Sequence, residues 1–278
     1  MKGKNDRPDH LDSSILRGVF RLLALLIASL LWLPFSAILI FFASLFDQRT
    51  RFRLITTLTS PFCRTMAAVA GLHVRREGKR DPDVLIYVTN HVSWLDILTA
   101  GIAVSGVFVS RHDVKNWPGI GLFARLAGTV FIDRSSLRSA ISSSNNIIER
   151  TEEGIRVLFF PEGRATSGDQ VEPFKAFLFG GITEKRLAVQ PLTILYTHIG
   201  RHPITPENKD QVYWYRTDQN FLSHAWQILK APNLKATVLF HKSEAPPINP
   251  DREGLREFAE RLRQKTAQGV PVWGSTVE

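Results

Sequence analysis

The sequence predicts an α/β protein whose mostly parallel central sheet is flanked by helices, preceded by an N-terminal helical segment embedded in a membrane. Two observations support this fold class. From about residue 84 onward, short runs rich in β-branched and aromatic residues alternate with helix-length segments, which is typical of a parallel sheet covered by helices. Before that point, the 25 residues 22–46 include no charged side chain. We therefore expect a membrane-associated helical region over residues 1–75 and an α/β domain over residues 76–278.

The apolar run is long enough to cross a bilayer, but its details favour a helical hairpin. As a straight helix it would reach about 37 Å, which exceeds a hydrocarbon core of about 30 Å. Pro34 lies almost at its centre, where a proline removes a helix hydrogen bond and tends to break the segment. Basic residues stand on both flanks, so the positive-inside rule gives no orientation for a single crossing. We expect this run to form two short helices that enter and leave the same leaflet. An amphipathic helix over residues 54–74, interrupted near Pro61, is expected to follow.

Six strands and four helices are predicted beyond this region. The strands are expected at residues 84–88, 107–109, 129–132, 156–160, 188–195 and 236–241, and the helices at residues 92–104, 117–126, 135–151 and 252–268. Residues 200–211 are rich in turn formers and predict a surface loop. In a domain of this kind, functional residues gather at strand ends and in the loops beyond them.

Composition and charge narrow the classes of protein without choosing among them. Hydrophobic residues make up 44% of the chain and charged residues 22%, which suffices for a substantial core and argues against disorder. A net charge of +9 favours an anionic partner, such as nucleic acid, a phospholipid surface or a phosphorylated substrate. Cys63 is the only cysteine, so it forms no intrachain disulfide and fits a reducing compartment. No zinc-binding spacing surrounds it, and we expect no metal site.

The stretch VTNHVSWLD places a histidine directly after a predicted strand and an aspartate five residues later. If His91 lies in the turn before the next helix, its ring can fold back over the helix start toward Asp96. A buried carboxylate there accepts the proton of one ring nitrogen and leaves the other nitrogen as a base toward a hydroxyl. The spacing alone is a weak signal, because a core histidine beside a helix-surface aspartate gives the same pattern.

Two later strand ends also carry charged residues. AGTVFIDR ends in Asp133 and Arg134, and LFFPEGRATSG places Glu162, Gly163 and Arg164 directly after a strand. Arginines in such positions suit a phosphate, because the planar guanidinium bonds two oxygens at once. The glycine lets the backbone approach a ligand closely. Taken singly, each arginine is explained equally well by a surface salt bridge.

Taken together, these stretches resemble the glycerolipid acyltransferases typified by lysophosphatidate (1-acylglycerol-3-phosphate) acyltransferase, over roughly residues 72–249. NHVSWLD resembles that family's His-x4-Asp block, and VKNWPGIGLFARLAGTVFIDR resembles its Lys-Pro-Gly segment and second block. FPEGRATSG resembles the third block and VQPLTI the fourth. Four blocks in the family's order and spacing make a chance likeness very improbable.

The resemblance implies direct transfer of an acyl group from a thioester of coenzyme A or acyl carrier protein to a lysolipid hydroxyl, with no other cofactor. It makes His91 the base and Asp96 the carboxylate that orients it. The residues implied at the substrates are Arg134, Glu162, Gly163 and Arg164 around the acceptor headgroup, Lys115 at an anionic end, and Pro191 in the pocket wall. The implied partners are membrane lipids and the thioester donor, at the cytoplasmic face of the inner membrane, and nucleic acid is not expected.

The chemistry agrees with this assignment. A thioester is already activated, so the hydroxyl needs only proton removal and a partner for the developing oxyanion. No enzyme nucleophile is required. The chain accordingly lacks a Gly-x-Ser-x-Gly elbow, and we expect Cys63 to lie away from the motif loops.

Two alternatives remain open. The third block of many family members reads Glu-Gly-Thr-Arg-Ser, whereas here the arginine stands one place earlier, as Arg164. The acceptor is therefore 1-acylglycerol-3-phosphate or, as the alternative, lyso-ornithine lipid or another lysophospholipid. A second class is a non-enzymatic basic module that binds an anionic membrane or nucleic acid. Its cations would form one patch, whereas here they are spread along the chain.

Overall fold

A computed structural model describes residues 10–117, 119–132, 137–216 and 218–271. Among these residues, seven strands form the central sheet in the order β1-β8-β6-β2-β5-β3-β4, and an eighth strand, β7, pairs with β6. The strands are β1 (Leu72–Glu77), β2 (Ile86–Thr89), β3 (Val107–Arg111), β4 (Val130–Ile132), β5 (Val157–Phe159), β6 (Val189–Ile199), β7 (His202–Pro203) and β8 (Leu234–Phe240).

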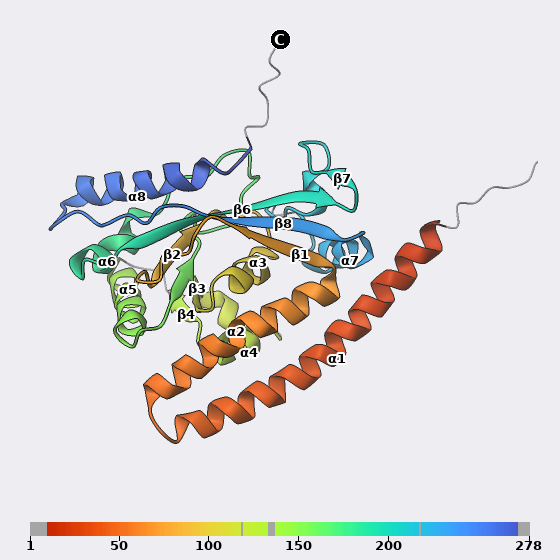
Figure 1. Ribbon diagram of the computed structural model, residues 1–278, viewed down its shortest axis with the longest axis horizontal. Helices are drawn as coiled ribbons and strands as arrows, with labels where there is room; N and C mark the ends of the chain where they lie inside the picture. The colour runs from red at the N-terminus through yellow and green to blue at the C-terminus, as the bar shows by residue number, and fades with distance from the viewer. Residues whose placement is uncertain (1–9, 118, 133–136, 217, 272–278) are drawn as a thin grey trace, which may run out of the picture.

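Helices cover both faces of this sheet, with α8 on one side and α2 and α3 on the other (Figure 1). The α-helices are α1 (His10–Ser44), α2 (Gln48–Ala70), α3 (Asp96–Ala103), α4 (Ile120–Leu126), α5 (Leu137–Glu152), α6 (Gly180–Glu184), α7 (Phe221–Lys230) and α8 (Arg252–Ala267). The described residues also include the short 3-10 helices η1 (His112–Asn116), η2 (Ala176–Phe179) and η3 (Lys209–Gln211). The α/β class and all six predicted strands are confirmed.

Strand direction brings several chain segments to one edge of the sheet. β2 pairs in parallel with both β5 and β6, and β3 pairs in parallel with β4 and β5. The carboxyl ends of these strands therefore lie at the same edge, where open α/β sheets bind their ligands. β8 runs antiparallel to β6, and β1 is parallel to β8. The loops after β2 and β5, which carry the sequence motifs, meet at this edge.

The sequence pattern did not predict β1, which spans the expected boundary between residues 75 and 76. We expected an amphipathic helix, interrupted near Pro61, to reach residue 74. Instead α2 ends at Ala70, its C-cap Gly71 has a left-handed φ of 78°, and β1 follows at once. Only Leu72 in this strand is fully buried, and its last three residues are exposed. An edge strand with so little alternation between buried and exposed positions gives almost no period-2 signal.

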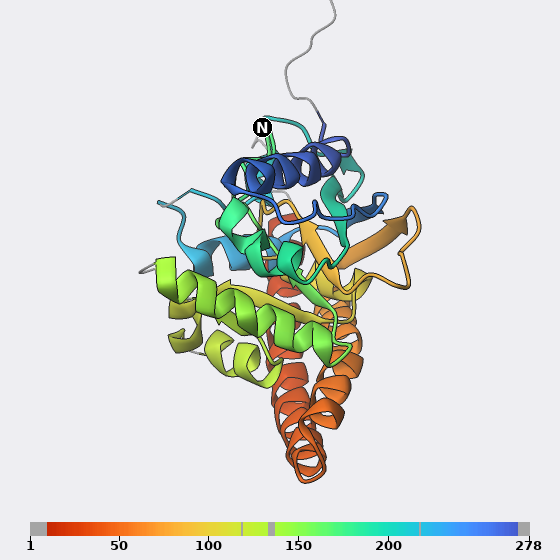
Figure 2. The same ribbon diagram turned by 90° about the vertical axis from the view of Figure 1, so that its left-hand side faces the viewer.

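The N-terminal region is a helical hairpin, but the expected break near Pro34 is wrong. α1 continues through Pro34, and the chain reverses instead at residues 45–47, where the Asp47 carboxylate accepts the Thr50 N–H at 2.7 Å and caps α2. Ser36 Oγ donates to the Trp32 carbonyl at 2.6 Å, close to the carbonyls that a proline disturbs. α2 likewise continues through Pro61. Figure 2 shows the tip of this hairpin projecting beyond the α/β domain.

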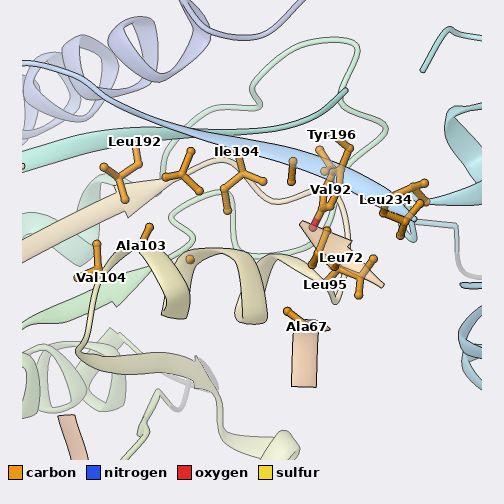
Figure 3. Close-up of a cluster of buried hydrophobic side chains, with 14 of the residues drawn as sticks. Ala67, Leu72, Val92, Leu95, Ala103, Val104, Leu192, Ile194, Tyr196 and Leu234 are labelled. Atoms are coloured by element: carbon orange, nitrogen blue, oxygen red, sulfur yellow. The ribbon is translucent and has the colours of Figure 1, made fainter. Parts of the chain in front are cut away.

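The buried side chains form two clusters, one on each face of the sheet. One lies between the sheet and α3, where Leu95, Leu192 and Ile194 are completely buried (Figure 3). The other, on the opposite face, includes Phe159 and Phe258. Close packing on both faces fixes the strand ends, and hence the loops that follow them, in one arrangement.

Candidate active site

His91 lies in the turn between β2 and α3, and the strand next to it holds this turn in place. The Asn90 side chain donates to the Ile194 carbonyl at 3.0 Å and accepts the Ile194 N–H at 2.8 Å, so it pairs with the backbone of β6. Ser93 Oγ donates to the Val212 carbonyl at 2.7 Å, and Trp214 N–H donates to the Val92 carbonyl at 2.8 Å. Residues on both sides of His91 are thus tied to the fold.

The predicted contact between His91 and Asp96 is confirmed. His91 Nδ1 lies 2.8 Å from Asp96 Oδ2. The same oxygen accepts the backbone N–H groups of Val92 at 2.7 Å and Ser93 at 2.9 Å. Asp96 is completely buried in the first turn of α3. Because a carboxylate only accepts, His91 carries its proton on Nδ1, and Nε2 keeps a free lone pair.

The His91 ring has one exposed edge and one covered face. The imidazole stacks on the Phe160 ring with centroids 4.2 Å apart and an angle of 21° between the planes. Its side chain is 20% exposed. The stacking and the bond to Asp96 together fix the ring orientation, so that Nε2 points to a defined place.

Glu162 connects three backbone segments around this ring. Oε1 accepts the His91 N–H at 2.6 Å, and Oε2 accepts the Glu172 N–H at 2.9 Å. The Thr166 hydroxyl lies within hydrogen-bonding distance of both Oε2 and the His91 carbonyl. Both carboxylate oxygens therefore have donors within the protein. Burial raises the pKa of Glu162 to about 7, against the opposing effect of these hydrogen bonds.

The other residues expected at the substrates lie at different depths. Gly163 adopts a left-handed φ of 85° in the turn that follows β5. Arg164 is exposed, and its side chain has no hydrogen-bond or ion-pair partner among the described residues. Lys115 is half-buried in η1. Pro191 is buried in β6 opposite Val88, away from the cavity described next, and Arg134 lies outside the described residues.

An apolar cavity of about 240 Å³ opens beside His91 and runs between the N-terminal helices and the α/β domain. α1 contributes Trp32, Ser36 and Ile40 to its wall. The ring of Phe62 on α2 contacts Trp32 at 5.9 Å and Phe123 of α4 at 5.4 Å between centroids, which joins the three helices around the cavity. A cavity with one polar corner at a histidine suits a ligand with a long apolar part and a reactive end.

Cys63 lines the same cavity, so the expectation that it lies away from the motif loops is wrong. α2 carries it inward toward the start of α3, against the Ile97 carbonyl. Burial raises the pKa of the Cys63 thiol to about 12. A thiol with so high a pKa is a poor nucleophile, so Cys63 is a poor candidate for a covalent intermediate.

Sequence patterns missed two residues that support the pair. Tyr196 in β6 donates to Asp96 Oδ1 at 2.8 Å, and Phe160 supports the imidazole ring. Tyr196 is separated from Asp96 by 100 positions, so no local spacing reveals it. Phe160 stands directly before the Pro-Glu-Gly motif and was visible as an aromatic residue at a strand end. Over the described part of the chain, no group of three or more His, Cys, Asp or Glu side chains is arranged to hold a metal ion.

Comparisons with known proteins agree with this geometry. The Acyltransferase family model matches residues 71–195. A lyso-ornithine lipid O-acyltransferase of Rhodobacter capsulatus is 36% identical over 214 residues, which cover 73% of each chain. A 1-acyl-sn-glycerol-3-phosphate acyltransferase of Neisseria meningitidis serogroup B is 34% identical over 204 residues, which cover 73% of this chain and 77% of that protein.

A solved structure adds evidence on the fold alone. The crystal structure of the 1-acyl-sn-glycerophosphate acyltransferase PlsC from Thermotoga maritima matches with a TM-score of 0.63 at 19% identity, over 92% of this chain and 96% of that one. The family match and the two relatives decide against the alternative of a non-enzymatic basic module. The chain belongs to the acyltransferase family and is an enzyme of lipid biosynthesis.

Proposed function

We propose that this acyltransferase moves an acyl chain from a thioester of coenzyme A or acyl carrier protein to the free hydroxyl of a membrane lysolipid, with 1-acylglycerol-3-phosphate as acceptor and phosphatidate as product. The observation that carries the proposal is the position of His91. Its imidazole, bonded to Asp96 at 2.8 Å, stands at the polar corner of an apolar cavity whose wall includes the long apolar helix α1. A candidate base therefore lies at the end of a cavity whose apolar walls suit an acyl chain.

His91 acts as a general base and then as a general acid. Nε2 takes the proton of the lysolipid hydroxyl while the hydroxyl oxygen attacks the thioester carbonyl carbon. The tetrahedral intermediate then collapses, the carbon–sulfur bond breaks, and the sulfur leaves with the proton held on Nε2. Asp96 keeps the ring in the tautomer that accepts on Nε2 and stabilises the imidazolium between the two steps. The products are an ester and a free thiol.

We assign the cavity to the acyl chain of the donor. The donor thioester arrives from the aqueous phase, but its acyl chain is apolar. The chain must therefore be kept out of water while the thioester carbonyl reaches His91. The lysolipid differs, because its own chain already lies in the bilayer. The cavity walls from α1 and α2 supply apolar contact, and Phe160 lies next to the reacting end.

Arg164 is our candidate for the negative charge of the acceptor headgroup. It follows Glu162 on the loop that holds His91, it is exposed, and no described residue occupies its guanidinium. Lys115 is a second candidate cation, and Arg134 remains a prediction from the sequence. Glu162 has both oxygens occupied by donors of the protein, so we assign it to holding the His91 loop rather than to contact with the headgroup.

We place α1 in one leaflet of the membrane, parallel to the surface, with α2 as its connection to the catalytic domain. α1 includes a 31-residue span, Ser14–Ser44, whose most apolar window has a mean hydropathy of 2.5 and is only 6% buried. Yet it is fastened to the domain: Arg21 donates to the Ala231 carbonyl at 2.8 Å, and Arg17 to the Lys230 carbonyl at 3.0 Å, at the end of α7. A helix held this way along a folded domain cannot cross the bilayer upright.

Within this proposal we keep the division of the chain that the sequence predicts, although β1 runs across its boundary. Residues 1–75, which contain α1 and α2, form the membrane-associated part in our proposal, and residues 76–278 carry the chemistry. We place the catalytic part on the cytoplasmic face of the inner membrane, because acyl thioesters are made in the cytoplasm.

Lyso-ornithine lipid is the alternative acceptor. Its support is the similarity to a lyso-ornithine lipid O-acyltransferase at 36% identity, together with the position of Arg164 one place earlier than in the Glu-Gly-Thr-Arg-Ser form of the third motif. A phosphate favours two or more cations, whereas a carboxylate paired with an ammonium needs one.

An acceptor panel tests the proposal. Purified full-length protein in mixed micelles receives one labelled acyl-coenzyme A or acyl carrier protein and, in parallel, 1-acylglycerol-3-phosphate, lyso-ornithine lipid and lysophosphatidylcholine, with His91→Ala as the blank. Labelled phosphatidate at the highest kcat/KM supports the main proposal. If only lyso-ornithine lipid gives a product, then lyso-ornithine lipid, and not 1-acylglycerol-3-phosphate, is the acceptor. If no acceptor gives product above the blank, the proposed function is refuted.

A further inference from the structure

We propose that Tyr196 is a positioning residue for acyl transfer, acting on His91 through Asp96; this inference rests on the proposed function. The Tyr196 hydroxyl donates at 2.8 Å to Asp96 Oδ1, the carboxylate oxygen opposite to the one that bonds His91. Tyr196 is 1% exposed and Asp96 is 0% exposed, so bulk water cannot replace this bond. Tyr196 does not line the cavity, so we assign it no direct contact with the substrates.

The direction of this hydrogen bond follows from the neighbouring groups. Thr99 Oγ1 lies 3.3 Å from the Tyr196 oxygen, but its own proton has a partner in the Leu95 carbonyl at 3.0 Å. The ionised carboxylate of Asp96 has no proton to give. The phenol proton therefore goes to Asp96. Burial is the main cause that raises the pKa of Tyr196 well above its usual value, and the charge of Asp96 adds to it. The phenol therefore stays a donor at any working pH.

Regular alternation along β6 turns Tyr196 to the same face of the sheet as Leu192 and Ile194. Tyr196 still pairs in register with Ala236 of β8, and the register shift between the two strands follows it, between Tyr196 and His198. Figure 3 shows Tyr196 on the strand above the start of α3, beside Val92 and Leu95. The turn that carries His91 thus receives support from a strand about a hundred residues later in the chain.

The four donors divide unequally between the two oxygens of Asp96. Oδ2 accepts from His91, Val92 and Ser93, whereas Oδ1 has Tyr196 as its donor among the described residues. Loss of the phenol leaves one buried oxygen without a donor. The carboxylate then either turns away from His91 or holds the imidazole proton more strongly. The first change misplaces Nε2, and the second makes the ring easier to protonate and so a poorer free base at low pH.

The main test is Tyr196→Phe, with Tyr213→Phe as the matched control. Tyr213 is 3% exposed, its ring lies 6.1 Å from that of Tyr196, and its hydroxyl makes no described hydrogen bond with Asp96. We expect Tyr196→Phe to lower kcat about tenfold with little change in KM for either substrate, a typical loss for a residue behind the reacting group. The acid limb of its pH–rate profile should move to higher pH, and Tyr213→Phe should leave both quantities unchanged.

A double-mutant cycle separates positioning from packing. In an Asp96→Asn background, Tyr196→Phe should change kcat less than about twofold, because the effect passes through the carboxylate. Replacement of Tyr196 by 3-fluorotyrosine keeps the ring and makes the phenol a stronger donor, so the acid limb should move to lower pH. This variant keeps the test informative if Tyr196→Phe fails to fold.

Equal losses in both backgrounds, or identical pH profiles for Tyr196→Phe, 3-fluorotyrosine and the wild type, would overturn the inference while acyl transfer by the wild type stands. If the wild type transfers no acyl group, the proposed function fails separately. The proton NMR signal of the His91 ring N–H then decides the inference without activity. A shift in Tyr196→Phe but not in Tyr213→Phe supports it, and unchanged signals in both reject it.

Discussion

The surroundings of His91 are polar and hydrogen-bonded on one side and apolar on the other. On one side, Asp96 and Glu162 are buried and together accept hydrogen bonds from side chains and backbone N–H groups on β6 and on the loops around His91. On the other side, the cavity is lined almost entirely by apolar side chains and opens next to the exposed face of α1. Buried polar groups must keep their hydrogen-bond partners, which makes the polar side rigid, whereas an apolar cavity discriminates among ligands by size and hydrophobicity.

This difference separates catalysis from recognition. In the proposed mechanism, contacts on the polar side place Nε2 of His91 and set its basicity, and contacts on the apolar side decide which acyl chains reach it. Changes on the polar side should therefore act on kcat and its pH dependence. Changes on the apolar side should act on membrane attachment and on the choice of acyl chain.

The largest effect is expected at the point where the two sides meet. His91→Ala should lower kcat/KM for acyl transfer by about 10²- to 10⁴-fold, the usual contribution of a general base. The melting temperature and vesicle binding should stay close to those of the wild type. Steady-state rates with a labelled thioester measure the loss. His73→Ala, an exposed histidine on the edge strand β1, is the matched control, and a His91→Ala enzyme with wild-type turnover contradicts the assignment of the base.

Substitutions on the exposed apolar face of α1 should weaken membrane attachment, whereas substitutions elsewhere on the surface should not. Leu30 on α1 is 72% exposed, and Ile248 in a loop far along the chain is exposed to the same extent. Leu30→Glu should weaken vesicle binding roughly tenfold or more, since a buried leucine contributes about 1.5–3 kcal/mol. Ile248→Glu should have no effect. Flotation with phospholipid vesicles measures both, and equal binding of the two variants would remove α1 from the lipid interface.

Acyl-chain choice should change when the cavity is narrowed from its α1 wall. Ser36 lines the cavity, and Ser44 lies on the same helix outside it. Ser36→Phe should lower kcat/KM for long-chain thioesters relative to short ones by about tenfold, the scale of size discrimination in an apolar pocket. Ser44→Phe should leave the preference unchanged. A series of thioesters with one fixed lysolipid gives the profile, and a change in lysolipid preference instead would assign the cavity to the acceptor chain.

The smallest effect concerns the pH dependence of stability on the polar side. Burial raises the pKa of Glu162 to about 7, so the folded state holds a proton that the unfolded chain releases above its ordinary value near 4.5. The contribution of this group to stability is present at low pH and is lost as pH rises through 7. Between pH 6 and 8 the loss amounts to about 1 kcal/mol.

Urea unfolding at several pH values measures this slope. Glu162→Gln should remove it, and Glu184→Gln, an exposed residue at the end of α6, should keep it. The same slope in Glu162→Gln and in the wild type would show that another group is responsible.

The sequence predicted those features of the protein that depend on residues close together in the chain. Alternating strands and helices gave the α/β sheet, and the spacing of His91 and Asp96 gave a contact that the structure confirms at 2.8 Å. The failures have non-local causes. Packing of Trp32 against Phe62 accompanies a continuous α1 despite Pro34, and Tyr196 reaches Asp96 only because the strand order brings β6 beside β2. Local propensity carries no information on either contact.

The fastening of α1 has a practical consequence for anyone who prepares this enzyme. Trimming a lipid anchor is a common way to obtain a soluble catalytic domain. Here such a truncation would also remove Trp32, Ser36 and Ile40, leaving the reaction chamber without one wall, and would strip Arg21 from the carbonyls that end α7. If α1 is the membrane anchor that we propose, the anchor also forms one wall of the cavity beside His91, and kinetics should be measured on the whole chain in detergent or nanodiscs.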